Sequence, residues 1–150
     1  MPLIWTSQHH SELDKESLYA ILELRTLVFV VEQKCPYQEV DGQDLQGDTC
    51  HLMAWQDGRL VAYLRLLDPE RHEGDVVIGR VVIAPETRGQ GLGHELMARA
   101  LEECHQRWPQ RPVYLSAQAH LQGYYGRYGF TPVTEVYLED DIPHIGMRRA

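Results

Sequence analysis

A chain of 150 residues, 43% of them hydrophobic and 24% charged, has the size and composition of a globular protein with one core. Its net charge of −8 argues against nucleic acid as a partner, and no run of eighteen apolar residues could span a membrane. Cys35, Cys50 and Cys104 are odd in number and widely spaced, so we expect no disulfide framework and no metal site. We therefore expect a cytoplasmic protein with a single domain over residues 1–150.

The first part of the chain predicts a strand, a long helix and an acidic loop. Leu3–Trp5 is the strand, and the apolar spacing predicts a helix from about Glu16 to Val31. Arg25 falls in the middle of the apolar stripe of this helix. A charge in that position must be paired or must reach a cleft, so a buried salt bridge and a substrate contact are both open. The polar segment 32–44 carries four carboxylates and does not match a calcium-binding loop.

Three strands and a glycine-rich turn occupy the middle of the chain. Residues 51–56 and 60–67 are separated by Asp57-Gly58, a two-residue hairpin signal. A third β-rich run covers residues 76–83 and leads through a proline turn into the segment RGQGLG at 88–93. This arrangement predicts a strand followed by a glycine turn.

A helix is predicted to begin at this turn. Leu92, Leu96, Ala100, Cys104 and Trp108 recur at every fourth position and form one apolar stripe, as in a helix that packs on a sheet. Unpaired N–H groups at a helix start bind anions, and glycine lets a phosphate approach the backbone closely. The turn matches neither a Walker A loop nor the dinucleotide fingerprint. We therefore predict a phosphate site of another class here.

The remaining elements complete a mixed α/β fold. They are a strand at 113–118, a short helix at 119–128, a strand at 133–138, a turn at 139–143 and a last strand at 145–149. A helix joins the strands at 76–83 and 113–118, and such a crossover implies a parallel pair. The predicted sheet is otherwise antiparallel. Its one parallel pair offers a place where two strand ends can part and admit a ligand.

The element order and the Arg-x-x-Gly-x-Gly pattern at 88–93 resemble the GNAT N-acetyltransferases over nearly the whole chain. A second match is Tyr125, which stands five residues before Phe130 of a Gly-Phe pair, as in that family. The resemblance implies the GNAT acyl-CoA N-acyltransferase fold, with helices on both faces of the sheet. Similarity to the ElaA branch rests on Arg25, Val28-Phe29, Glu32-Gln33, Cys35-Pro36-Tyr37, Asp41 and Asp44 together with Pro143 to Met147.

The same resemblance implies an acetyl-CoA-dependent enzyme and gives its residues roles. The backbone of Val81 and Ile83 would pair with the pantetheine arm like an added strand, and an amide at the end of this strand would stabilise the oxyanion. Tyr125 would protonate the departing thiolate, and Gln118 stands where the family often places an Asn that contacts CoA. The pyrophosphate would be held by Arg88 and by the amides of Gly89, Gln90, Gly91, Leu92 and Gly93.

The acceptor side is defined less sharply. An attacking amine must be neutral, although a lysine-like amine has a pKa of about 10.4, so some group must take a proton. Glu32, His120 and His144 are candidates, and His120, beside the end of the strand at 113–118, is the preferred base. Acetyltransferases of this kind build the acceptor site after the first helix. This implies that Arg25, Glu32 and His144 bind the substrate.

The predicted partner is a small-molecule or peptide amine. Two alternatives stay open. A non-catalytic acyl-CoA-binding module would need the phosphate turn but no positioned acid such as Tyr125. An acyl transfer like that of acyl-homoserine-lactone synthases would use the same fold and a similar acidic front end. The sequence leaves the acceptor, the acyl-chain length and the oligomeric state open, and a homodimer is among the arrangements it allows.

Overall fold

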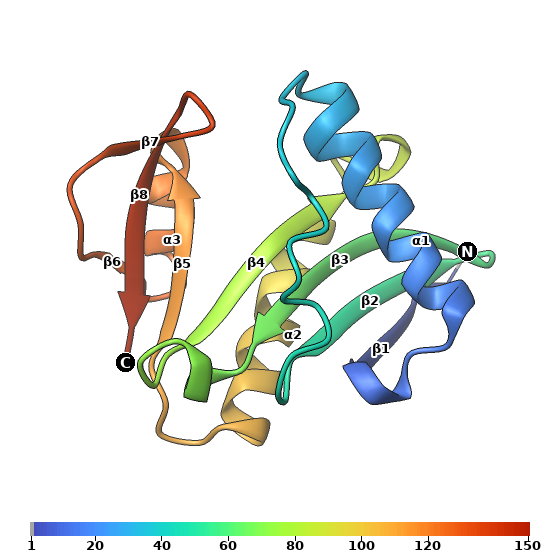
Figure 1. The fold of residues 1–150 in the computed structure, drawn as a ribbon, viewed down its shortest axis with the longest axis horizontal. Helices are drawn as coiled ribbons and strands as arrows, with labels where there is room; N and C mark the ends of the chain where they lie inside the picture. Colours follow the sequence, from blue (N-terminus) through green and yellow to red (C-terminus); the bar gives the residue numbers. More distant parts are fainter. Residues whose placement is uncertain (1) are drawn as a thin grey trace.

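The computed structural model describes residues 2–150 as one sheet with helices on both of its faces (Figure 1). The strands are β1 (Ile4–His9), β2 (Cys50–Gln56), β3 (Arg59–Leu67), β4 (Val76–Ile83), β5 (Val113–Gln118), β6 (Thr131–Pro132), β7 (Tyr137–Glu139) and β8 (Ile142–Arg149). The α-helices are α1 (Lys15–Arg25), α2 (Leu92–Arg107) and α3 (Gln122–Gly126). A π-helical segment, η2 (Thr26–Glu32), continues α1, and short 3-10 turns are η1 (His10–Glu12), η3 (Pro69–Arg71), η4 (Pro85–Thr87) and η5 (Ala119–Leu121).

The strand order is β1-β2-β3-β4-β5-β8-β6, with β7 also paired to β8. Every neighbouring pair is antiparallel except β4 and β5, which are parallel. That pair is in register only at Val76–Val113 and Val77–Tyr114. Beyond these residues the two strands diverge, as Figure 1 shows between the yellow-green β4 and the orange β5. The predicted fold class and its parting parallel strands are confirmed.

A β-bulge in β4, just beyond the point where its pairing with β5 ends, increases the divergence. Gly79 pairs with Arg65 of β3 and Val82 pairs with Tyr63, so two residues of β4, Arg80 and Val81, stand opposite one residue of β3. An extra residue bends the strand that contains it and increases the local twist. β4 therefore curves away from β5 while it keeps its antiparallel pairing with β3.

The two long helices cover opposite faces of the sheet. Asp14 caps α1, because its carboxylate accepts the backbone N–H of Ser17 at 2.7 Å. Figure 1 shows α1 in front of the sheet and α2 behind it. The predicted apolar stripe of α2 is buried against the sheet, with Leu96 and Ala100 fully covered. Helix α2 therefore holds the glycine turn at a fixed place beside the end of β4.

Two predicted elements differ from the observed ones. The helix expected over 16–31 leaves the α-helical path after Arg25 and continues as the π-helical segment η2. Within α1 the buried stripe includes Leu24, while Leu22, expected in the core, is only half-buried. The strand expected over 133–138 is wrong for residues 133–136, and only its end forms a strand, β7. Val133, at the start of this stretch, donates its N–H to the Gly146 carbonyl of β8 at 2.8 Å, but no strand continues from it.

Candidate active site

A cavity of about 1050 Å³ opens where β4 and β5 part. This volume is just above the usual range for ligand sites, roughly 300–1,000 Å³. Several predicted site residues line it together, although they come from different elements: Val81, Ile83, Arg88, Gln118, His120, Tyr125 and His144. Arg25, Glu32 and the turn 89–93 do not line it.

One wall of the cavity is an unpaired strand edge. On its β5 side, β4 has registered partners only for Val76 and Val77, so residues 78–83 continue without a neighbouring strand. An unpaired edge presents N–H and C=O groups to any extended chain that lies along it. Val81 and Ile83, predicted to pair with a pantetheine arm, belong to this edge. Its geometry is suited to that ligand.

The glycine turn has the conformation that only glycine adopts readily. Gly89 and Gly91 have φ angles of +81° and +75°, and no atom lies within 4 Å of where a Cβ would stand on either. Gly91 is the N-terminal cap residue of α2, so the first free N–H groups of the helix follow it. Leu92 buries its side chain in the core and Gln90 is exposed. The turn therefore offers backbone amides beside open space, which fits a pyrophosphate.

Arg88 and Glu32, which were assigned to different ligands, are paired with each other. The Arg88 Nη2 and Nη1 atoms donate to the two Glu32 carboxylate oxygens at 2.6 and 3.0 Å. This hydrogen bonding from Arg88 holds the pKa of Glu32 below its usual range. Arg88 Nε also lies 3.3 Å from the Ile83 carbonyl, on the unpaired edge of β4. A phosphate and a pantetheine arm would have to compete with these contacts.

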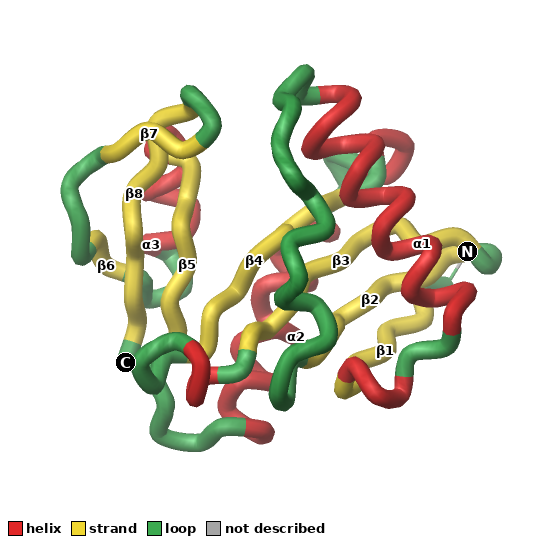
Figure 2. The backbone as a smooth tube through the Cα atoms, in the orientation of Figure 1, coloured by secondary structure: helices red, strands yellow, loops and turns green. Residues whose placement is uncertain are grey.

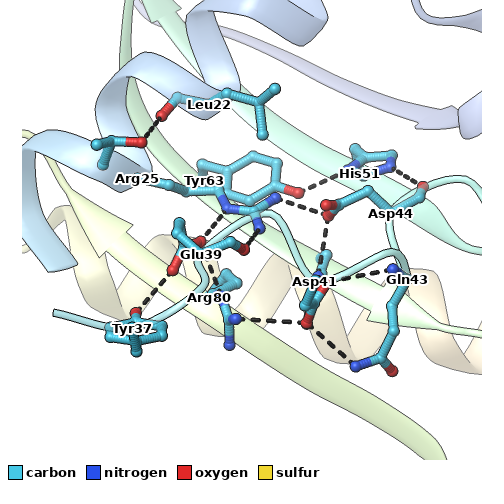
Figure 3. Close-up of polar contacts among 12 residues, drawn as sticks. Leu22, Arg25, Tyr37, Glu39, Asp41, Gln43, Asp44, His51, Tyr63 and Arg80 are labelled. Carbon is cyan, nitrogen blue, oxygen red and sulfur yellow. Dashed lines mark hydrogen bonds and ion pairs between the residues drawn. The ribbon is translucent and has the colours of Figure 1, made fainter. Parts of the chain in front are cut away.

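Arg25 is completely buried and does not reach the cavity. Its Nε donates to Glu39 at 2.5 Å and its Nη1 donates to Asp44 at 2.6 Å (Figure 3). Burial alone would raise the pKa of Asp44, but the hydrogen bonds and charges of Arg25 and Arg65 together outweigh it and lower that pKa. Arg25 was predicted either to form a buried salt bridge or to contact the substrate, and the structure shows the buried salt bridge. Binding of the substrate by Arg25 stays a prediction, and Arg25 does not line the cavity.

Two further arginines join the same carboxylates from the sheet. Arg65 on β3 donates to Asp41 at 2.7 Å and to Asp44 at 3.0 Å, and Arg80 on β4 donates to Glu39 at 2.8 Å. Figure 2 shows the connecting loop, residues 33–49, running across the front of these strands. Sequence reasoning missed Arg65 and Arg80 as site residues. The available signal was Arg80, a charge inside the apolar run of β4, because a charge in such a position must be paired, as for Arg25.

His51 closes one end of this network. It is fully buried, with Nε2 at 2.9 Å from the Asp44 carbonyl and Nδ1 at 2.6 Å from the Tyr63 hydroxyl. A carbonyl only accepts, so Nε2 carries a proton. Burial lowers the pKa of His51 to about 4, so the ring is neutral at neutral pH and Nδ1 accepts from the Tyr63 hydroxyl.

Tyr125 presents an unengaged hydroxyl to the cavity. Its ring is buried and packs edge-to-face against Tyr124 and Phe130. Among residues 2–150 its hydroxyl makes no hydrogen bond, and Tyr125 is one of the residues that line the cavity. Burial raises the pKa of Tyr125 above its ordinary value, so the phenol stays protonated at neutral pH. It can act as a hydrogen-bond donor to a ligand.

The two candidate histidines have different surroundings. His144 is nearly buried, and its Nδ1 lies 2.7 Å from the Ile142 carbonyl, which requires the proton on Nδ1. Nε2, the nitrogen left for a lone pair in a neutral ring, lies 3.6 Å from a Glu139 oxygen. His120 is exposed on η5 at the rim of the cavity. Both reach the cavity, but only the tautomer of His144 is set by a partner.

The described residues also limit what else the site holds. Within residues 2–150 no three His, Cys, Asp or Glu side chains are grouped so that they could bind a metal ion. Over the same range no helix has both the length and the apolar character needed to cross a membrane. The cysteines at 35, 50 and 104 are all free thiols.

Comparison with known proteins gives consistent matches. The model of the acetyltransferase (GNAT) domain matches residues 11–150. The chain is 55% identical to protein ElaA of Escherichia coli over 97% of its own length and 95% of that protein. It is 73% identical to a crystal structure of an acyl-CoA N-acyltransferase from Pseudomonas aeruginosa, with a TM-score of 0.98 over 99% of this chain and 100% of that one. An acyl-homoserine lactone synthase, BjaI, is 20% identical with a TM-score of 0.81 over 98% and 82% of the two chains, which shows likeness of fold alone.

The buried neutral state of His51 predicts a loss of stability in mild acid. The unfolded chain takes a proton on this histidine near its ordinary pKa of 6.5, whereas the folded protein takes it near 4. The free energy of unfolding should therefore fall by up to about 3 kcal/mol as the pH drops from 6.5 to 4. Urea unfolding at several pH values measures this fall. His51→Gln, which cannot take the proton, should show a smaller fall, and equal falls in both proteins would contradict the prediction.

Proposed function

This chain belongs to the GNAT acetyltransferase family, and on that premise we propose that it transfers the acetyl group of acetyl-CoA directly to a primary amine of a small molecule or peptide. Membership of the family supports an acyl-CoA co-substrate. The observation that carries the proposal is one cavity that combines the unpaired edge of β4, the unengaged hydroxyl of Tyr125 and the side chain of Arg88. A cytoplasmic location and a homodimeric state stay predictions.

The proposed binding mode follows the geometry of the cavity. The amides of the turn 89–93 and the guanidinium of Arg88 would hold the pyrophosphate at the start of α2. The pantetheine arm would run along the edge of β4, beside Val81 and Ile83, as an added strand. Gln118, at the end of β5, would contact the arm from the opposite wall. The thioester would then lie beside the bulge in β4.

The proposed reaction is a direct attack of the amine nitrogen on the thioester carbonyl. The C–N bond forms as the electron pair of the C=O bond moves to oxygen, and backbone amides at the bulge of β4 would stabilise that charge. The tetrahedral intermediate then collapses, the C–S bond breaks and the thiolate leaves. Tyr125 would hydrogen-bond to the sulfur and protonate it. His144 would take the proton of the amine on Nε2, because its Nδ1 already carries one; His120 stays a prediction for that role.

A panel of amines tests the proposal directly. Each amine is incubated with acetyl-CoA and the purified protein, release of free thiol is followed, and the product is identified by mass spectrometry. We expect stoichiometric CoA and N-acetylated product for at least one class of amine. Tight binding of acetyl-CoA without transfer to any amine would instead support a non-catalytic acyl-CoA-binding module.

Removal of the Tyr125 hydroxyl should slow the chemical step. Tyr125→Phe keeps the buried ring and removes only a proton donor, and such a donor is typically worth about 10²–10⁴ in rate. We expect a single-turnover rate at saturating acetyl-CoA that is lower by at least about 100-fold, with stability and CoA affinity little changed. Tyr19→Phe, on the exposed face of α1, is the matched control. A Tyr125→Phe rate within about threefold of the parent would leave Tyr125 a packing residue, as buried tyrosines often are.

The pairing of Arg88 with Glu32 predicts that Glu32 opposes binding of the co-substrate. Glu32→Gln removes the charge that competes with the pyrophosphate for Arg88, so acetyl-CoA should bind up to about fivefold more tightly. Isothermal titration calorimetry measures the change. Glu95→Gln is the control, since it removes an equal charge in the first turn of α2 that pairs with Arg99 rather than Arg88. An unchanged acetyl-CoA affinity with a raised acceptor KM would contradict this prediction and support a role of Glu32 in binding the acceptor.

A further inference from the structure

One arginine inside β4 has a backbone conformation that L-amino acids rarely adopt. Arg80 has a φ of +54° at the bulge. Seven non-glycine residues in the described range 2–150 have positive φ, and Arg80 is the one that lies within a strand, whereas the others lie in turns. A side chain at such a φ crowds the backbone, and strain of this kind persists only where the surroundings hold it.

The contacts that hold Arg80 come from the connecting loop. Its Nε donates to Glu39 Oε2 at 2.8 Å and its Nη2 to Asp41 Oδ2 at 3.3 Å. The guanidinium also lies over the ring of Tyr37, 5.7 Å from its centre. Figure 3 shows these three side chains converging on Arg80. The side chain is therefore held on two sides by charge and on a third by an aromatic face.

The carboxylates that hold Arg80 are themselves fixed. Glu39 Oε2 also accepts from the fully buried Arg25 of α1, and Asp41 Oδ2 also accepts from Arg65 of β3. Glu39 is only 5% exposed, and Tyr37 donates its hydroxyl to the other oxygen of that carboxylate at 2.7 Å. Neither carboxylate can follow Arg80 if the bulge relaxes. The loop thus gives Arg80 an immobile anchor.

We propose that Arg80 is a positioning residue for acyl transfer, whose ion pairs with Glu39 and Asp41 keep the bulge of β4 in the shape that directs its backbone amide at the thioester oxygen. This inference rests on the proposed function. The guanidinium acts on the backbone of its own strand and not on the reacting atoms. Because Arg80 is also partly exposed at the cavity wall, direct contact with a substrate is the competing role that the test must separate.

Two substitutions separate these roles. Arg80→Ala removes the ion pairs but keeps a Cβ that disfavours positive φ, so the bulge should relax. Arg80→Gly also removes the ion pairs, but glycine adopts positive φ freely, so the bulge should largely persist. Complete loss of an oxyanion donor lowers kcat by about 10²–10³. Arg80→Ala should only displace the donor, so we expect kcat to fall by at least about tenfold. The kcat of Arg80→Gly should be at least about threefold higher than that of Arg80→Ala. The KM for acetyl-CoA should change little in both variants.

Asp57 provides the matched control. It has a φ of +52° in the turn between β2 and β3, away from the cavity. Asp57→Ala and Asp57→Gly repeat the same backbone comparison and should shift the melting temperature without changing kcat. If Arg80→Ala does not fold, Arg80→Lys replaces it, since lysine keeps the Cβ but cannot bridge both carboxylates as the planar guanidinium does.

A spectroscopic measurement makes the test independent of turnover. In ¹⁵N-labelled protein, the amide resonance of Val81 should move in Arg80→Ala and stay near its parent position in Arg80→Gly. A parent protein that acetylates no amine would contradict the proposed function, and the Val81 resonance would still decide whether Arg80 holds the bulge. Parent-like kcat in Arg80→Ala, or equal loss in both variants with an unmoved Val81 amide, would overturn the positioning role.

Discussion

The structure depends on the early parting of two parallel strands. β4 and β5 share only two registered residue pairs, and the bulge opposite β3 then turns β4 away. Every feature of the cavity follows from this divergence. The edge of β4 loses its neighbour, the end of β5 becomes a free wall, and α3 brings Tyr125 to the opening. A regular eight-stranded sheet would have paired the same backbone groups and left no room for a ligand.

Two kinds of ion pair surround this opening, and their burial gives them different physical roles. Arg25 and Arg65 are almost completely covered. Arg25 pairs with Glu39, Arg65 pairs with Asp41, and both pair with Asp44 of the same loop. Charges buried in this way are tolerated only when they are well paired, and removal of one partner leaves another charge stranded. Such a network is poor as a source of stability. It is effective at fixing where the connecting loop lies against α1, β3 and β4.

The pair between Arg88 and Glu32 is of the other kind. Both side chains are more than a third exposed, and ion pairs in water are weak and screened by salt. Glu32 also ends a π-helical segment, a form of helix that is rare and often found at functional sites. An anion with more charge than one carboxylate can replace Glu32 readily. The buried network therefore holds the shape of the site, whereas the exposed pair allows a bound anion to replace Glu32 at Arg88.

The sequence alone determined the elements whose signals are local. The apolar run of β4, the glycines of the turn and the stripe of α2 are read from residues a few positions apart, so the fold class and the family could be recognised from them. The exact course of residues 131–139 could not be predicted from the sequence. Val133 and Val136 have strand propensity, but their pairing depends on how β8 lies beside them. Only the tertiary structure decided the partners of Arg25, the union of Glu32 with Arg88 and the left-handed backbone of Arg80. These contacts join residues 14, 56 and 41 positions apart, and no local pattern specifies which opposite charges meet once a chain has folded.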